Sequence, residues 1–516
     1  MNVPDAKTLV ARGQAYLRRG EIDRALNAFD RAIELDSIDV DVLFLRGNAR
    51  ATYGRFDGAV DDFTRAIELQ PDFAAAYHNR GMAHADAGRS DEAVADFSEA
   101  IRLTPGDPDP LNARGVLYAR AEKYEAAIAD FTAAVELDPK AARVYFNRGN
   151  SYAAREADAE ALADYTEALR YQPQFARAYL YRGQTHARLG DNAAAVTDFA
   201  TALRIDPNQA EGFTHRARAY VELGESRRAL ADLTRSIKLD PLDPTALNLR
   251  GVVHAELEEY DEAIADFTTA LKIDPDDHAS YFNRGLAHAR RGEAQAARDD
   301  FTAALEHRPE DVAALLNRGS VADELGDPAA AIADLTEVLR LEPGNPRALV
   351  RRGVIYRRRG ELDTAFADFD AALTSDPDDA LAYNLRASVY FARGDYALAV
   401  ADHRQALVAD PDNPATLNYL AWVLATCPNL ALIDGPQARE YAERACEKTN
   451  YEHAGFLDTL AAACAAEGRY GDAAFWEKKA IALVPPDDRG AYEARLALYE
   501  AGRPYTDDPA SMSDWS

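Results

Sequence analysis

A period of 34 residues runs through most of this 516-residue sequence and limits the folds that it can adopt. The segment KYEAAIADFTAAVELDP at 123–139 returns as EYDEAIADFTTALKIDP at 259–275, four periods later. Steps of 34 residues from position 13 to position 421 meet only glycine or alanine. A repeat that recurs this often without an insertion is typical of an array of stacked structural units.

Each period has the residue pattern of two helices. An alanine recurs from Ala25 to Ala399, and four residues later comes a large side chain, usually a phenylalanine such as Phe29. Spacings of three and four residues place apolar side chains on one face of a helix. Glycines such as Gly54 and Gly88 suit the turn between the two helices, and a proline closes the second helix. One such pair cannot bury its own apolar face, so we expect the units to stack.

This register resembles that of the tetratricopeptide repeat family, at repeat positions 8, 20, 24, 27 and 32. The resemblance implies an all-α fold, a right-handed superhelical solenoid of 34-residue helix-turn-helix repeats. It assigns twelve regular units to residues 6–413. Residues 414–453 are a diverged repeat with about five inserted residues, within CPNLALIDGP, and residues 454–487 are a terminal repeat. Residues 488–516 are expected to form a capping helix and a polar tail.

The excess of acidic side chains excludes some classes of binding partner. The chain carries 87 acidic and 58 basic side chains, a net charge of −29, which argues against nucleic acid and anionic membrane surfaces as partners. No apolar run is long enough for a membrane span, and the start lacks the pattern of a signal peptide. We expect a cytoplasmic protein with protein or peptide partners. The preference for arginine over lysine suggests a bacterial source, and the oligomeric state stays open.

Little of the sequence is left for chemistry outside the repeats. The cysteines have no C-x-x-C spacing, and no phosphate-binding glycine motif is present. Four histidines share position 11 of their repeats, where they form either a metal or acid–base ladder or a packing substitute for tyrosine: His84, His186, His254 and His288. We expect no enzyme, no catalytic residue, no metal and no cofactor.

The resemblance places the binding surface on the first helix of each repeat. In this family those helices line a concave groove, and positions 2, 5, 6, 9, 12 and 13 contact extended or helical peptides. Asparagines at position 6 could donate to and accept from a peptide backbone: Asn79, Asn147, Asn283 and Asn317. Phenylalanines at position 5 are either apolar anchors or core residues: Phe44, Phe146 and Phe282.

An arginine-rich repeat stands out from the acidic background. The segment RALVRRGVIYRRRGEL at 347–362 places Arg347, Arg351, Arg357 and Arg358 on the groove side by register. Guanidinium groups pair well with carboxylates, so these residues are candidates for binding an acidic segment. The alternative is that they neutralise neighbouring acidic helices.

A second set of arginines is strictly periodic. Position 7 is arginine in all twelve regular units, as in Arg148 of YFNRGN and Arg284 of YFNRGL. Position 23 is aspartate in eleven successive units, from Asp62 to Asp402. Both positions lie beside the predicted packing face of their helix. We predict a repeated Arg–Asp ion pair that bridges two helices, within one unit or between neighbours, rather than a ladder that binds a ligand.

These features together predict a protein–protein interaction scaffold that binds peptide or helical segments in the concave groove. Two other functions use the same sequence features. One is an architectural or assembly factor that self-associates, and the other is a substrate-recruiting subunit of a separately encoded enzyme.

Overall fold

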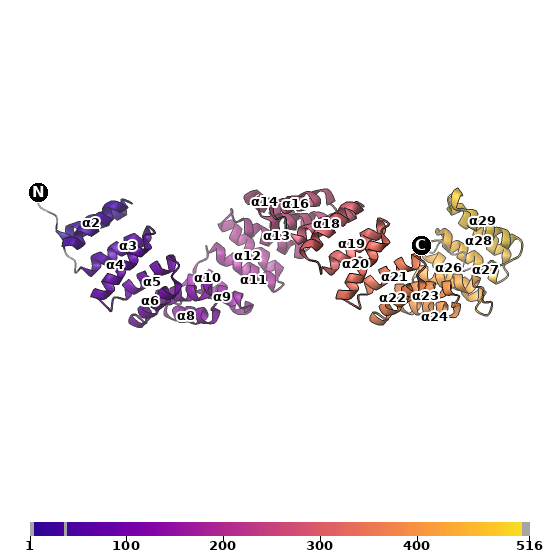
Figure 1. The fold of residues 1–516 in the computed structure, drawn as a ribbon, viewed down its shortest axis with the longest axis horizontal. Helices are drawn as coiled ribbons and strands as arrows, with labels where there is room; N and C mark the ends of the chain where they lie inside the picture. The colour runs from indigo at the N-terminus through magenta and orange to yellow at the C-terminus, as the bar shows by residue number, and fades with distance from the viewer. Residues whose placement is uncertain (1–4, 36–38, 508–516) are drawn as a thin grey trace. The chain divides into compact units, whose positions relative to one another are not determined.

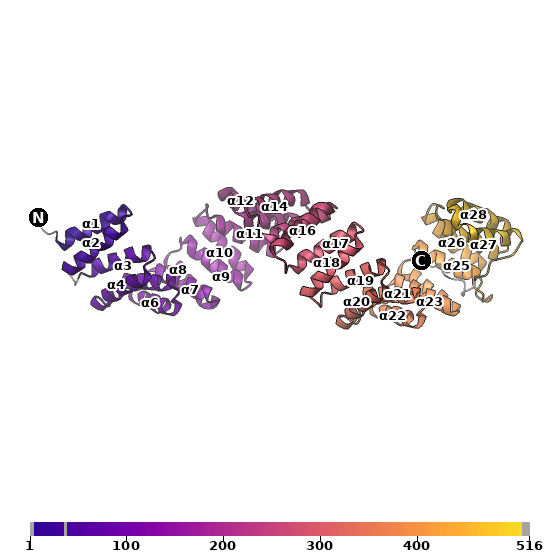
Figure 2. The ribbon, with the colours of Figure 1, turned by 45° about the horizontal axis from the view of Figure 1, so that its top comes forward.

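The computed structural model describes residues 5–35 and 39–507, and helices account for most of them. No strand occurs within these ranges, which confirms the all-α prediction. The chain divides into two compact parts, Met1–Leu257 and Glu258–Ser516. Figures 1 and 2 show that each part is a row of helical hairpins that follow one another in chain order.

The described residues of the first part form the helices α1 (Ala6–Arg18), α2 (Ile22–Leu35), α3 (Val40–Thr52), α4 (Phe56–Leu69), α5 (Ala74–Asp86), α6 (Ser90–Leu103), α7 (Pro108–Arg120), α8 (Tyr124–Leu137), α9 (Ala142–Ala154), α10 (Asp158–Tyr171), α11 (Ala176–Arg188), α12 (Asn192–Ile205), α13 (Ala210–Glu222), α14 (Ser226–Leu239) and α15 (Pro244–Glu256).

The second part contains α16 (Tyr260–Ile273), α17 (His278–Arg290), α18 (Ala294–His307), α19 (Val312–Glu324), α20 (Pro328–Leu341), α21 (Pro346–Arg358), α22 (Leu362–Ser375), α23 (Ala380–Arg393), α24 (Tyr396–Ala409), α25 (Pro414–Thr426), α26 (Gly435–Lys448), α27 (Ala454–Ala466), α28 (Tyr470–Leu483), the short 3-10 helix η1 (Pro486–Asp488) and α29 (Gly490–Glu500).

Tight turns join the two helices of each regular hairpin. The middle residue of the turn has a positive φ, for example 74° at Gly54 and 79° at Gly88. Glu122 and Glu156 occupy the same place with φ values of 57° and 60°. A residue with a Cβ atom adopts this conformation at an energetic cost, so the packing of the helices imposes the turn even where glycine is missing.

The start of the first helix is stabilised in two ways. Where aspartate precedes the helix, its carboxylate accepts an N–H from the first turn, as Asp311 does from Ala314 at 3.0 Å. Where a phenylalanine precedes the helix, it packs instead on the position-5 ring of the preceding hairpin. Phe175, for example, lies 4.8 Å from Phe146 between ring centroids. Phe146 is buried, whereas Phe44 and Phe282 are half-buried and pack on the core rings Phe63 and Phe301 of their own hairpins. Of the three position-5 phenylalanines, Phe146 is thus a core residue, and the other two are partly packed against the core.

The core of each hairpin is built on one close contact. A Cβ atom added to Gly353 would lie only 2.6 Å from Cε1 of Phe369, which is fully buried. The two helices can approach this closely only because position 8 lacks a side chain. Where the position is occupied by Ala217 or Ala387, the facing residue is no longer phenylalanine but Leu233 or His403.

The C-terminal hairpins depart from the regular arrangement. Residues 427–434 connect α25 to α26, which is a longer connector than in the preceding hairpins. Helix α25 packs on α27 as well as on α26, and α29 packs on α28. The exact repeat boundaries assigned from the sequence stay a prediction.

Two neighbouring glycines give a matched test of the core contact. A Cβ atom at Gly319 would meet only ordinary contacts, the nearest at 3.4 Å, because Leu335 replaces the phenylalanine. We expect Gly319→Ala to raise the free energy of unfolding by up to about 1 kcal/mol, since alanine favours the helix. Gly353→Ala should lower it by about 1–3 kcal/mol through overpacking against Phe369. Urea unfolding followed by circular dichroism measures both, and shifts of the same sign would contradict the contact model.

Candidate functional site

The periodic arginines are held by aspartates of the same hairpin. Arg148 on α9 donates from Nε to Oδ2 of Asp164 on α10 at 2.8 Å and from Nη2 to Oδ1 at 2.7 Å. Its remaining Nη1 donates to Oγ1 of Thr132 on α8, the second helix of the preceding hairpin, at 3.1 Å. Asp164 is only 4 % exposed. One guanidinium therefore joins three consecutive helices.

This arrangement recurs along both parts of the chain. The bidentate pairs include Arg80–Asp96, Arg114–Asp130, Arg148–Asp164, Arg182–Asp198, Arg216–Asp232, Arg284–Asp300, Arg318–Asp334, Arg352–Asp368 and Arg386–Asp402. The hydroxyl acceptors from the preceding hairpin are Thr64, Ser98, Thr132, Thr166, Thr268, Thr302 and Thr336. The predicted ion pair is confirmed and lies within one hairpin. Sequence reasoning missed the hydroxyl, although it recurs at position 25.

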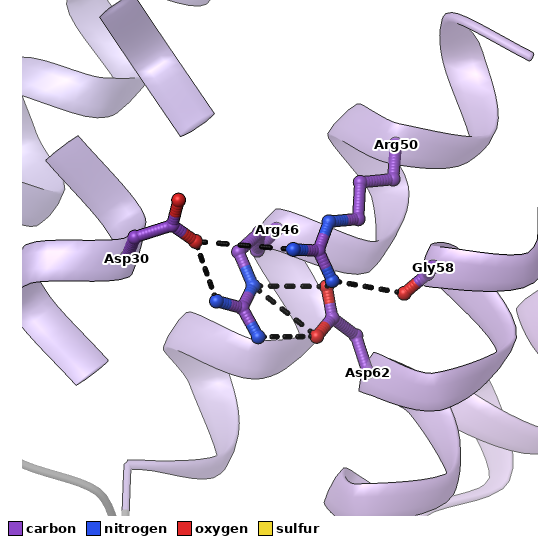
Figure 3. Close-up of polar contacts among 5 residues, drawn as sticks. All are labelled: Asp30, Arg46, Arg50, Gly58 and Asp62. Atoms are coloured by element: carbon purple, nitrogen blue, oxygen red, sulfur yellow. Dashed lines mark hydrogen bonds and ion pairs between the residues drawn. The ribbon is translucent and has the colours of Figure 1, made fainter. Parts of the chain in front are cut away.

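The second hairpin uses a carboxylate in place of the hydroxyl. Figure 3 shows Arg46 between Asp62 of its own hairpin and Asp30 of the preceding one, with the Nη1–Oδ1 distance to Asp30 at 2.6 Å. Arg50 adds a second guanidinium, which lies 2.9 Å from Asp62 and donates to the carbonyl of Gly58 at 3.1 Å. The ladder thus adjusts to the acceptor that the preceding repeat provides.

The electrostatics of the pair are those of a buried structural contact. The hydrogen bond from Arg148 to Asp164 raises the pKa of the guanidinium, which stays charged. Burial raises the pKa of Asp164, and the guanidinium opposes that effect. Both charges are thus used within the fold, so the periodic arginines are framework residues rather than a ligand-binding ladder.

A double-mutant cycle at Arg148 and Asp164 tests this framework role. Asp164→Ala should lower the free energy of unfolding by about 3 kcal/mol, because it leaves a buried guanidinium without its carboxylate. Arg148→Leu combined with Asp164→Ala should cost clearly less than the sum of the two single variants. Chemical denaturation of all four proteins measures the coupling.

The exposed pair Arg170 and Glu167, on the same helix as Asp164, is the matched control. Its cycle should show no measurable coupling, since exposed ion pairs contribute little. Additive losses at Arg148 and Asp164 would contradict a buried, mutually dependent pair.

The asparagines predicted at position 6 contact the adjacent first helix or their own helix. Asn79 on α5 donates to Oδ1 of Asn48 on α3 at 2.6 Å, and Asn147 on α9 donates to Oδ1 of Asn112 on α7 at 3.0 Å. Asn317 on α19 donates instead to the carbonyl of Ala313 in its own helix. Asn283 lies on α17, so the structure does not gather the four asparagines at one point. They remain candidates along the face that the first helices form, called here the first-helix face.

Asn147 also lines a cavity. The cavity has a volume of about 300 Å³ and lies among α7, α8 and α9. Arg120, Tyr124 and Asn150 contribute to its walls together with Asn147. The hydroxyl of Tyr165 donates to Oδ1 of Asn150 at 2.9 Å, which fixes one wall. Sequence reasoning missed this cavity, and its lining shows no sequence signal that would have predicted it.

Helix α21 does bring the four predicted arginines together. Arg347 and Arg351 are exposed and lie one helical turn apart on the same face. Arg351 reaches α19, where Nη1 donates to the carbonyl of Leu316 at 3.2 Å and to the hydroxyl of Ser320. Arg358 pairs with Asp323 of α19. Arg351 and Arg358 thus link α21 to α19, and the positive charge of this surface comes from α21.

Arg357 has a different environment from the other three. It is half-buried, and burial lowers the pKa of its guanidinium, with the neighbouring charge of Arg358 acting in the same direction. Tyr419 on α25 is also among its electrostatic neighbours, so Arg357 shares the helix of Arg347 and Arg351 but not their exposure.

A buried acidic cluster lies at the end of the array. Asp458 on α27 accepts a hydrogen bond from Nε of Arg495 on α29 at 2.7 Å, and Oε1 of Glu477 on α28 lies 3.8 Å from the same nitrogen. Glu477 is 0 % exposed. Burial and the adjacent charge of Asp458 raise the pKa of Glu477 to about 10. One guanidinium therefore balances one carboxylate, and the second carboxyl group holds a proton.

This proton makes the stability of the C-terminal hairpin depend on pH. Glutamate in an unfolded chain titrates near pH ~4.3, so between that value and pH 10 the folded state binds one more proton than the unfolded state. The stabilising contribution of Glu477 is complete below pH ~4.3 and falls as pH rises, by up to about 1.4 kcal/mol per pH unit. Glu477→Gln should raise the melting temperature at pH 8–9 and flatten its pH dependence, as followed by tryptophan fluorescence.

Exposed Glu493 on α29 provides the control for that measurement. Glu493→Gln should leave the pH dependence unchanged. An unchanged profile in Glu477→Gln would show that the carboxyl group is ionised in the folded protein.

The other reactive side chains have local contacts. Nδ1 of His84 lies 2.9 Å from Nε of Arg89, and Nδ1 of His288 lies 2.5 Å from Oε2 of Glu293. Within residues 5–35 and 39–507, no three histidine, cysteine, aspartate or glutamate side chains are grouped to hold a metal ion. The free cysteines are buried, and burial raises the pKa of Cys464 to about 11, which disfavours the thiolate. No helix among the described residues, 5–35 and 39–507, has the length and hydropathy of a membrane span.

Family models match most of the sequence. Tetratricopeptide repeat models match residues 10–61, 46–108, 159–210, 215–278, 316–380 and 351–414, and a further one matches 253–316. A TPR repeat model matches residues 118–155. The chain belongs to the tetratricopeptide repeat family.

Solved structures of repeat proteins resemble parts of the chain. A crystal structure of MamA protein is 24 % identical, with 33 % of this chain and 92 % of that chain covered and a TM-score of 0.31. The APC/C hetero-tetramer Cut9–Hcn1 gives 16 % identity, coverage of 81 % and 96 %, and a TM-score of 0.38. A tetratricopeptide repeat protein from Parabacteroides merdae gives 20 % identity, coverage of 48 % and 98 %, and a TM-score of 0.37. A comparison with curated protein sequences finds no match.

Proposed function

We propose that this chain is a protein-interaction scaffold that binds an acidic segment of a partner protein on the first-helix face of α19 and α21. The tetratricopeptide fold is typical of non-catalytic scaffolds for protein interactions. The observation that carries the proposal is the pair of exposed arginines Arg347 and Arg351 on one face of α21, in a chain with a net charge of −29. A basic surface on an acidic chain selects acidic segments and steers them toward one place.

The chemistry of the surface supports a carboxylate-rich ligand. A guanidinium group has five N–H donors in a planar fork. In Arg351 only the Nη1 group donates to α19, so the other N–H groups can meet a ligand. Arg347 extends the surface by one helical turn and is exposed. Two such forks on one helix face can each donate two N–H groups to the oxygens of a carboxylate.

The first-helix face also carries neutral polar groups on the helices that precede α21. Asn317 lies on α19 itself, and Asn283 lies on α17, two helices earlier. Amide groups can donate to and accept from the backbone of an extended segment. Affinity would then come from carboxylate pairing at α21 and backbone contacts along the neighbouring first helices. Self-association and recruitment for a separate enzyme would use the same fold, and both stay alternative predictions.

Removal of the two exposed arginines tests this proposal. A fluorescein-labelled decamer of alternating glutamate and glycine serves as the acidic probe, with affinity measured by fluorescence anisotropy. Arg347→Ala combined with Arg351→Ala should weaken binding about tenfold, which corresponds to about 1.4 kcal/mol. Higher salt should weaken binding to the native chain and have less effect on the variant.

Arg340→Ala is the matched control, because it removes a positive charge from exposed Arg340 on α20, where the side chain pairs with Glu337. It should leave the affinity unchanged. Equal weakening by Arg340→Ala would mean that net charge alone attracts the probe. In a pull-down from native lysate, partners that persist after the loss of Arg347 and Arg351 would overturn the assignment of this surface.

A further inference from the structure

The last described residues of the chain lie against the first helix of an earlier hairpin. The backbone N–H of Asp507 donates to the carbonyl of Thr426, at the end of α25, at 2.8 Å. The indole Nε1–H of Trp422 donates to Oδ2 of Asp507 at 2.7 Å. Asp507 is only 5 % exposed, although it follows a segment without regular secondary structure. The tail is therefore packed onto α25.

Aromatic and cation–π contacts also hold the tail in the site that it occupies, called here the seat of the tail. The rings of Tyr505 and Trp422 lie 5.8 Å apart between centroids. The guanidinium of Arg495 lies 5.7 Å from the Trp422 ring and 5.5 Å from the Tyr505 ring. Arg495 itself donates a hydrogen bond to Asp458 at 2.7 Å, which holds the guanidinium in place. The seat is formed by side chains of three helices, α25, α27 and α29.

The tail contacts α25 as a bound peptide would. Trp422 and Thr426 stand at repeat positions 9 and 13, which belong to the positions expected to face a peptide. Tyr505 and Asp507 face the protein, whereas Thr506 between them is exposed. Alternating contacts of this kind are typical of an extended segment read by its backbone and by every second side chain.

We propose that α25, α27 and α29 form a second binding site, which takes an extended segment with an aromatic residue two positions before an aspartate. In the free protein the site is occupied by the chain's own Tyr505–Asp507, so a partner segment must displace this tail. The inference rests on the proposed function as a scaffold for partner segments, but it uses residues separate from the basic surface of α19 and α21.

The contacts explain this selectivity. The indole N–H of Trp422 meets a carboxylate at the aspartate position, and the neighbouring N–H of that residue meets the Thr426 carbonyl, so the site fixes the length of the acidic side chain. The aromatic residue fills the space beside Trp422 and Arg495, where cation–π attraction adds to apolar contact. The tail leaves α29 at Glu500, only a few residues earlier, so its effective concentration at the site is on the order of millimolar.

The experiment uses the full chain and a labelled peptide of its own tail, GRPYTDDP, which corresponds to residues 502–509. Fluorescence anisotropy measures its affinity for the native chain and for a variant with Tyr505→Ala and Asp507→Ala. The variant should bind the peptide at least about tenfold more tightly, because the native site is available only in the small fraction of molecules whose tail has left it. Thr506→Ala, the matched control in the same tail, should bind as weakly as the native chain.

Two further variants test which groups of the site and of the tail are responsible for binding. Trp422→Phe, added to the tail variant, should remove the gain in affinity, since it deletes the N–H that meets the carboxylate. Asp507→Asn keeps the shape of the tail, and this single variant should show a smaller gain than the double variant. Circular dichroism melting checks that each protein is folded.

Equal affinity of the native chain and the folded tail variants for the peptide would overturn the proposal. So would a gain in affinity that survives Trp422→Phe. Either result, with binding of the glutamate–glycine probe at Arg347 and Arg351 intact, would refute only the tail site. Loss of the probe's dependence on those two arginines would refute the proposed function instead.

Discussion

The contact between position 8 and the side chain at position 24 sets the distance between the two helices of each hairpin, and the rest of the structure depends on that distance. A glycine at position 8 leaves room for a phenylalanine ring, to the point that a Cβ atom at Gly353 would overlap Phe369. Where position 8 gains a side chain, position 24 is no longer phenylalanine: Ala217 faces Leu233 and Ala387 faces His403. The converse does not hold, since Gly319 faces Leu335 with room to spare. The constraint therefore acts on the pair of a phenylalanine ring and a side chain at position 8, which would overlap.

The ion-pair ladder is a consequence of this approach. Positions 7 and 23 flank the glycine and the ring, so the same close packing that buries Phe369 brings Arg352 to 2.7–2.9 Å from Asp368. Two charges at this depth are stable only together, and their bidentate geometry fixes the register of one helix against the other. The remaining Nη1 then reaches Thr336 of the preceding hairpin. A contact inside one hairpin is in this way extended to its neighbour.

Features that follow the period could be predicted from the sequence, because register alone fixes their neighbours. The helical hairpins, the buried alanines and the pairing of Arg148 with Asp164 belong to this class. The period could not decide whether the pair lay within a hairpin or between hairpins, since both choices share the same spacing. The period also could not predict contacts that do not repeat. The amide of Asn147 donates a hydrogen bond to Asn112, and the indole of Trp422 donates one to Asp507, 85 residues later. Such contacts depend on the folded position of single side chains.

The last hairpin shows how the array can end without a neighbouring repeat. Its position 24 is Glu477, a buried carboxyl group in the place of the phenylalanine ring. This carboxyl group lies beside Asp458 and Arg495 of α29: Arg495 donates to Asp458, and its Nε is 3.8 Å from Oε1 of Glu477. The same arginine forms one wall of the seat for Tyr505. Replacement of one apolar core residue by an acid thus ties the final hairpin, the cap helix and the tail into one network, and the face that would otherwise meet the next repeat is covered by the chain's own residues.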